Sequence, residues 1–243
     1  MSEISVGRIG DFSAGFVPPE LRGDGRDEEA LRFQQSPARD YRSLSSEQIE
    51  ILVKNNNTAE DWDRLRVTES FDPRLVRGCQ FWGLVRIGGL SASFLEYHEM
   101  RVPVGFSNST IISCDIGSDA AIHNVHYLAR YIIGDQVILF NLDEMHAVNH
   151  AKFGNGIVKD GEPESVRIWL EVGNENGGRS ILPFDGMLAA DAWIWSRYRE
   201  RPELLERLRE MTDRQFDRRR GYYGVVGDRA VIKNSRIIKD TLI

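Results

Sequence analysis

Residues 116–124 read IGSDAAIHN, residues 133–141 read IGDQVILFN, and residues 226–234 read VGDRAVIKN. The first two stretches are offset by 17 residues, from position 116 to position 133. Each stretch has an aliphatic residue followed by Gly, a second aliphatic residue six positions after the first, and a final Asn. This spacing matches neither the period of an α-helix nor the alternation of one long strand. It is typical of a hexapeptide β-helix, in which three short strands and three corners close one triangular coil.

The repeat predicts a place for each kind of residue. Aliphatic side chains such as Ile116 and Ile133 point inward, where stacked coils bury them in one continuous core. The Gly after each of them lies at a corner, where a side chain would crowd the next coil or where φ is positive. Asn124 and Asn141, with their copy in the third repeat, are predicted at other corners. Asn tolerates a left-handed backbone and can bond to its own copy one coil above.

The rest of the chain is divided around these coils. Residues 1–40 mix Gly, Pro, Arg and acidic residues without periodicity, which predicts a flexible arm. Residues 41–70 form a helical cap, whose first helix follows the capping box SSEQ at 45–48 and whose second starts at Thr58. Coils occupy 71–145, with a loop or hairpin leaving them between 89 and 106 before Ile111 re-enters. They resume over 221–243, where the chain stops in mid-coil, so we expect a longer protein or an oligomer partner that covers the open end.

Residues 146–220 interrupt the coils as an insertion. Val166, Ile168 and Leu170 alternate as in a strand, and NENGG at 174–178 predicts the turn of a hairpin. A helical period then predicts one helix through Ile194 and a second helix that opens at Pro202.

Composition excludes several classes of protein. The chain has 243 residues, 31 Lys and Arg against 37 Asp and Glu, and a net charge of -6, so no affinity for nucleic acid or for an anionic membrane is expected. Two cysteines are too few for a disulfide scaffold or a zinc site. The N-terminus lacks a signal peptide pattern and no long apolar run follows, which predicts a cytoplasmic protein.

Residues 41–243 resemble an uncharacterised bacterial family, domain-of-unknown-function family 4954, whose larger members carry a left-handed β-helix. The motifs that carry the resemblance are YRSL at 41–44, FDP at 71–73, FGNG at 153–156, ENGGR at 175–179 and YRERPEL at 198–204. The family's coil is in turn similar to the acyltransferase half of bacterial sugar-nucleotide enzymes that work on N-acetylglucosamine phosphate. The resemblance implies a mainly β fold, a left-handed parallel β-helix with an inserted β-hairpin and helical hairpin and a small helical N-terminal cap. It also implies a homotrimer.

An acyltransferase of this kind is expected to use a histidine as general base in a groove between coils. His123 follows the inward Ile122, so strand alternation places its ring on the outer surface, and we predict it as the catalytic base. His126, Asn124 and Asn141 are predicted to bind substrate.

The same position also has a purely structural interpretation. The equivalents of His123 in the other two copies are Phe140 and Lys233, so this is an exposed position that accepts many residue types. A plain surface histidine is therefore the alternative.

No metal site is predicted. His123 and His126 are three apart, which sends their rings to opposite faces of a strand unless a corner intervenes. His146 and His150 are four apart and would align only on a helix, which MHAVNH at 145–150 does not favour. Coenzyme A is the cofactor that acyl transfer would use.

Two functions of different classes follow. One is a hexapeptide-repeat, transferase-like enzyme that acts on a sugar nucleotide or an acyl carrier such as acyl-coenzyme A at a groove between subunits. The other is a noncatalytic β-helix scaffold that oligomerises and presents its helical hairpin to a partner.

Overall fold

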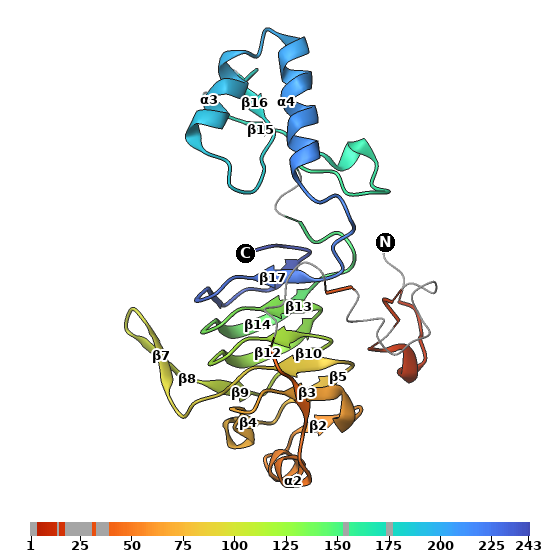
Figure 1. Ribbon diagram of the computed structural model, residues 1–243, viewed down its shortest axis with the longest axis vertical. Helices are drawn as coiled ribbons and strands as arrows, with labels where there is room; N and C mark the ends of the chain where they lie inside the picture. Colours follow the sequence, from red (N-terminus) through yellow and green to blue (C-terminus); the bar gives the residue numbers. More distant parts are fainter. Residues whose placement is uncertain (1–3, 14, 18–30, 33–38, 153–155, 174–176) are drawn as a thin grey trace.

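The computed structural model describes residues 4–13, 15–17, 31–32, 39–152, 156–173 and 177–243. Short strands are stacked one above another along the long axis of the molecule (Figure 1). The fold is mainly β, and most neighbouring strands in the stack are parallel. The pairs β1–β3, β7–β8 and β15–β16 are antiparallel. None of the helices in the described part of the chain is long and apolar enough to cross a bilayer.

A six-stranded sheet forms what we call the first wall. Its parallel strands, in order, are β3 (Leu65–Val67), β6 (Val85–Ile87), β11 (Asp115–Ile116), β13 (Tyr131–Ile133) and β17 (Gly224–Val226). The sheet begins with β1 (Arg42–Ser43), which lies antiparallel to β3. Ile116 pairs with Ile133, and Ile133 pairs with Val226, so the predicted layering of these three residues is confirmed.

A nine-stranded sheet forms the other two walls because its two long strands turn. β12 (Ala121–Ala129) and β14 (Ile138–His146) pair along their length and bend at Asn124 and Asn141, where φ is 54° and 58°. Their first halves form the second wall with β4 (Val76–Arg77), β9 (Gly105–Ser107) and β18 (Val231–Lys233). Their second halves form the third wall with β2 (Thr58–Ala59), β5 (Gln80–Trp82), β10 (Thr110–Ile112) and β19 (Ile237–Lys239).

Each wall contributes inward side chains to every turn of the chain. On the second wall Ile122 is in register with Leu139, and on the third wall Leu128 is in register with Met145. All four are buried, and they belong to one core cluster with the inward residues of the first wall. Burial of each such side chain stabilises the fold by about 1.5–3 kcal/mol, so the column of inward residues is the main source of stability.

The corners carry the residues that the repeat predicts. Asn141 donates from Nδ2 to Oδ1 of Asn234 one turn above, at 2.9 Å, and both have positive φ. Glycine is required at its corners because a side chain would collide with the next turn. Positive φ is not the reason at Gly117, where φ is not positive. A Cβ on Gly117 would lie 2.4 Å from the carbonyl oxygen of Gly134.

Parallel pairing starts earlier in the chain than residue 71, where the coils are predicted to begin. β2 and β3 lie within 41–70 and pair with β5 and β6. The helix predicted to start at Thr58 is wrong, because Thr58 donates its backbone N–H to the carbonyl of Cys79 and continues the third wall. The first predicted helix is confirmed as α2 (Ser46–Lys54), with the capping box between Ser45 and Gln48. Two short 3-10 turns, η3 (Trp62–Arg64) and η4 (Pro73–Leu75), complete this region.

Two segments leave the stack and return to it (Figure 1). The predicted hairpin between 89 and 106 is confirmed as β7 (Phe94–Tyr97) and β8 (Met100–Pro103), and it packs Val102 on the outer face of the second wall against Ala121 and Ile138. The chain re-enters at β9, before Ile111, because Gly105 at φ 114° lets it pass close to Leu75.

The insertion of residues 146–220 follows β14. It contains η5 (Glu164–Val166), β15 (Leu170–Glu171), β16 (Ser180–Ile181), α3 (Ala189–Arg197) and α4 (Pro202–Gln215). Both predicted helices are confirmed. The strand predicted from Val166 begins only at Leu170, since Val166 ends a 3-10 turn. Residues 153–155 of the FGNG motif and 174–176 of the predicted turn lie outside the described residues.

Parts of the segment predicted as a flexible arm pack on the first wall. We call residues 9–17 and 31–32, as far as they are described, the N-terminal strap; it includes η1 (Ile9–Asp11). Val17 and Leu31 are buried against the outward Ile132 and against Tyr223. Phe12 stacks edge-on against Trp82, with ring centroids 4.8 Å apart.

A buried charge cluster holds this strap to the stack. The guanidinium of Arg32 pairs with the carboxylate of Asp115, and the two side chains are 1% and 3% exposed. Arg86 pairs with the second oxygen of the same carboxylate. Arg32 also donates to the carbonyl of Leu84 at 2.6 Å and to the hydroxyl of Tyr223 at 3.1 Å. Buried ions need such complete pairing, because an unpaired one would cost several kcal/mol.

Truncating an inward residue should destabilise the stack far more than truncating an outward one on the same strand. Leu139→Ala in β14 should lower the free energy of unfolding by about 2–5 kcal/mol, because it leaves a cavity in a fully buried layer. The exposed Glu144→Ala on the same strand should change it by less than about 0.5 kcal/mol. Urea unfolding measures both, and equal losses would contradict the inward assignment.

Two substitutions at the corner residue Asn141 should distinguish the cost of backbone strain from the cost of a lost hydrogen bond. Asn141→Gly removes the bond to Asn234 but accepts positive φ, whereas Asn141→Ala also forces a Cβ into a left-handed conformation. The Ala variant should therefore be less stable than the Gly variant by about 1–2 kcal/mol. Thermal or urea unfolding of the two variants checks this order, and an Ala variant as stable as the Gly variant would refute it.

Candidate functional site

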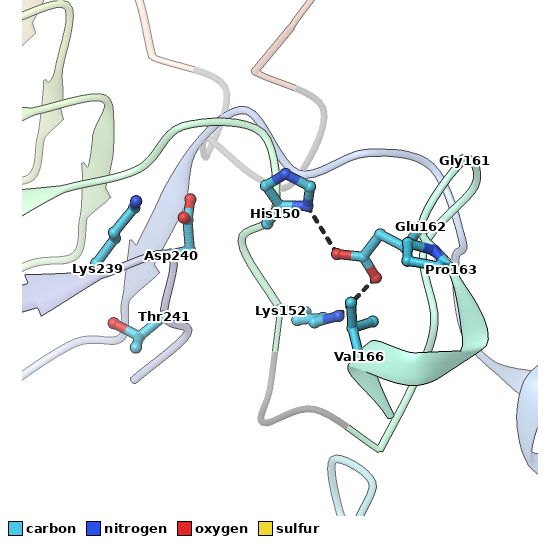
Figure 2. A pocket seen from close by; sticks show the side chains of 9 residues that line it. All are labelled: His150, Lys152, Gly161, Glu162, Pro163, Val166, Lys239, Asp240 and Thr241. Atoms are coloured by element: carbon cyan, nitrogen blue, oxygen red, sulfur yellow. Dashed lines mark hydrogen bonds and ion pairs between the residues drawn. The ribbon is translucent and has the colours of Figure 1, made fainter. Parts of the chain in front are cut away.

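A pocket lies where the insertion leaves and rejoins the stack. Its volume is about 540 Å³, and it is open to solvent. The residues that line it from the insertion are His150, Lys152, Gly161, Glu162, Pro163 and Val166; those from the last turn of the stack are Lys239, Asp240 and Thr241 (Figure 2). Backbone bonds join the two sides, since Lys152 forms a parallel bridge with Thr241 and Ala151 donates its N–H to the carbonyl of Gly221 at 2.9 Å.

Glu162 is the central acceptor of this pocket. Its side chain is 4% exposed and receives hydrogen bonds from His150 Nδ1 at 2.7 Å, from Lys152 Nζ at 2.6 Å and from the Lys159 backbone N–H at 2.8 Å. Burial by itself would raise the pKa of Glu162. The three donors and the Lys152 charge outweigh burial and hold the pKa of this carboxyl below its usual value, so Glu162 is an anion at neutral pH.

His150 is oriented by this carboxylate. An ionised carboxylate only accepts hydrogen bonds, so Nδ1 of His150 carries the hydrogen and Nε2 of the neutral ring is an acceptor. Figure 2 shows Nδ1 turned toward Glu162 and the second ring nitrogen turned away from it. The side chain is 44% exposed, so a molecule in the pocket can reach the ring. A carboxylate that fixes the tautomer of a histidine in this way prepares it to accept a proton at Nε2.

His123, the predicted base, lies on the outer face of the second wall, as strand alternation requires. Its Nε2 donates to the carbonyl of Pro103 at 2.8 Å, and its Nδ1 accepts from the hydroxyl of Ser107 at 2.7 Å. Burial lowers the pKa of His123, so its ring stays neutral in the folded protein at pH 7. Both ring nitrogens already have a partner within the chain. To accept a substrate proton, His123 would first have to release Ser107.

The other predicted site residues lie at or near corners. His126 is exposed, with Nδ1 3.3 Å from a carboxylate oxygen of Asp143. The corner at Asn124 separates it from His123, so both rings lie outside the stack but on different walls. Asn124 accepts from the side chain of Asn108 and Asn141 bonds to its copy, in ladders that join the corners. None of these residues lines the pocket that contains His150.

From the sequence alone, the only role that suggests itself for His150 is that of a metal ligand paired with His146, four residues earlier. The structure places His146 at the end of β14 and His150 in an irregular segment after it. Within the described residues no cluster of three His, Cys, Asp or Glu side chains is arranged to hold a metal ion. The partner of His150 is Glu162, 12 residues further on, and an irregular connection of this length leaves no periodic signal in the sequence.

Replacing Glu162 should give a pH-dependent loss of stability. Glu162→Gln removes the anion that Lys152 and His150 contact, so at pH 7 the variant should be less stable by about 3 kcal/mol. The pKa of Glu162 is lowered on folding, so its contribution is complete above its unfolded value near 4.5 and is lost as the pH falls through the folded value. Urea unfolding should therefore show a smaller difference from the parent protein at about pH 3.5.

The exposed Glu144→Gln serves as the control and should not lower stability at either pH. A deficit in Glu162→Gln that stays the same at both pH values would contradict the role of the ionised carboxylate.

Comparison with known proteins identifies relatives but no described activity. The chain is 50% identical over 231 residues to an uncharacterized protein of Treponema pallidum (strain Nichols), a match that covers 94% of this chain and 32% of that protein. The chain thus spans about a third of the length of this relative. No solved structure matches the chain. Residues 41–243 match the family described as "Domain of unknown function (DUF4954)", and the chain therefore belongs to this family.

Proposed function

We propose that the stack is a left-handed parallel β-helix and that the protein is a hexapeptide-repeat, transferase-like enzyme. The 17-residue return of the chain to the first wall, from Ile116 to Ile133, supports the β-helix, as do the positive φ values at successive corners. Proteins of this architecture can serve many functions, so the reaction has to be argued from the pocket.

The observation that carries the proposed activity is the 2.7 Å contact between Glu162 and His150 at the edge of the pocket. Nε2 of His150 takes the proton from a hydroxyl or amine of the acceptor as that group attacks the acyl carbon of a thioester. The new bond to the acyl carbon forms, the carbon–sulfur bond breaks, and the leaving thiolate takes the proton from the imidazolium, which restores the neutral His150 ring. The charge of Glu162 stabilises the imidazolium formed in this step.

The substrates we propose are an acyl carrier such as acyl-coenzyme A and a sugar nucleotide as acceptor. The pocket lies between two parts of one chain, so this site does not require a groove between subunits. If the protein forms a homotrimer, the third wall is the face we propose for the contact. The strap covers part of the first wall and the β7–β8 hairpin covers part of the second, whereas the strap meets the third wall at the end of β5, where Phe12 packs on Trp82.

A noncatalytic scaffold is the second candidate. Exposed apolar side chains on the insertion favour it: Leu188, Trp193 and Met211 are 68%, 57% and 66% exposed. Apolar side chains gathered on a surface often mark a contact with a partner.

The two candidates differ in the effect of His150→Asn. If the pocket is catalytic, this variant should lower the rate of acyl transfer from acyl-coenzyme A to a uridine sugar nucleotide by about 10²–10⁴-fold, the usual contribution of a general base. The control is His98→Asn in the hairpin turn, an exposed position with φ of 53° that Asn accepts, and it should keep the parent rate.

A parallel His123→Asn variant tests the base predicted from sequence. If His150 is the base, His123→Asn should retain the transfer rate and lose stability, because it breaks the contacts to Ser107 and Pro103. No transfer and no thermal stabilisation with any donor or acceptor would leave the scaffold as the function, since a ligand at a hundred times its Kd stabilises a fold by about 2.7 kcal/mol.

A further inference from the structure

Each carboxylate of the pocket accepts at least one hydrogen bond from the protein itself. Glu162 accepts from His150, Lys152 and the backbone of Lys159. Asp240 accepts from the backbone N–H of Val148 at 2.6 Å. A ligand cation would have to compete with these donors, several of which are charged or fixed in the backbone, so the pocket is poorly suited to a positively charged ligand.

On the other side of the pocket, the ammonium of Lys239 has no such partner among the described residues. Lys239, at the end of β19, lines the pocket and is exposed. In the described part of the chain its ammonium forms neither a hydrogen bond nor an ion pair. Its charge acts on the neighbouring His146, whose pKa is lowered first by burial and next by Lys239. An unpaired ammonium beside a concave surface attracts anions.

A second cation, Arg220, lies next to the lining residue Gly161, although Arg220 does not itself line the pocket. Gly161 lines the pocket with φ of 81°, and a Cβ there would lie 2.5 Å from a terminal nitrogen of Arg220. The absence of a side chain on Gly161 thus lets the Arg220 guanidinium lie against the rim. Arg220 is held in place by a bond from its Nε to the carbonyl of Asp160 at 3.0 Å, which leaves its other donors available to a ligand.

We propose that the molecule bound in this pocket carries an anionic group, a phosphate or a carboxylate, that pairs with Lys239, with Arg220 at the rim adding attraction. The inference rests on the proposed function, since the reacting hydroxyl or amine of the same molecule is the group that faces Nε2 of His150. A volume of about 540 Å³ accommodates a small molecule whose two ends reach both sides. His150 then accepts the proton of the reacting hydroxyl or amine, and Lys239 favours acceptor molecules that carry a phosphate or a carboxylate.

The test is an anion titration of the full chain followed on the histidine rings by NMR. The chain has five histidines, so the ring resonances are few, and His150→Asn identifies that of His150. Inorganic phosphate and acetate are the two probes, and they distinguish a phosphate from a carboxylate. We expect a saturable shift of the His150 resonance with at least one of them, weakened by added salt as a paired charge requires.

Lys239→Met should raise the Kd of the anion about fivefold, and Lys239→Glu should abolish the saturable shift. The matched control is Lys233→Met, an exposed lysine on β18 of the same turn that does not line the pocket, and it should leave the Kd unchanged. An unchanged Kd in Lys239→Met overturns the inference. So does the lack of a saturable shift with both probes up to about 100 mM, where even sites of millimolar affinity are filled.

Failure of this inference and failure of the proposed function give different results. If His150→Asn loses acyl transfer while Lys239→Met binds phosphate and acetate as the parent protein does, the assignment of His150 as the base is supported and the anion site at Lys239 is refuted. If His150→Asn keeps the transfer rate while Lys239→Met weakens anion binding, the anion site at Lys239 is supported and the assignment of His150 as the base is refuted.

Discussion

The structure depends on the register between successive turns of the chain. On the first wall Ile133 pairs with Ile116 on one side and with Val226 on the other, although 93 residues separate Ile133 from Val226. Each inward side chain is buried by the layers above and below it, so no turn is stable by itself. Whatever lies between two turns must return the chain to the same register, because a slip by one residue would turn the inward side chains outward.

This constraint explains where the long insertion can be placed and why a pocket forms beside it. The insertion leaves after β14 and returns at β17, and the bridge between Lys152 and Thr241 ties its first residues to the last turn. The last turn of the stack lies on one side and the irregular first part of the insertion on the other. The inward side chains of the stack do not reach the space between them, so a concave surface remains. Polar residues can gather there without disturbing the layers, and Glu162 and His150 do so.

Much of the stack and little of the pocket could be predicted from the sequence. The aliphatic residues six apart and the recurring Asn predict the walls and the corners, because both follow from geometry that repeats with each turn. The earliest turn is less regular. Its inward residues Val67 and Val76 are nine apart, so no six-residue spacing marks this turn, and the sequence predicts a helix from Thr58 instead.

The contacts of the pocket and of the strap could not be predicted for a different reason. His150 and Glu162 meet through an irregular segment, and Arg32 meets Asp115 across 83 residues of chain. Pairings of this kind depend on the three-dimensional path of the chain and not on a local period. The same holds for His123, whose outward position follows from alternation but whose bonds to Ser107 and Pro103 depend on where the hairpin returns.

The strap also has a consequence for biosynthesis. Arg32 leaves the ribosome 191 residues before Tyr223, the last of its partners to be made. Until Tyr223 emerges, Leu31 and Val17 have only part of their binding surface, and Asp115 can be paired only by Arg86 and an incompletely held Arg32. Contacts so distant in sequence form slowly because a long loop must close first. The nascent chain therefore passes through a stage in which its turns are stacked but the first wall is not yet covered by the strap.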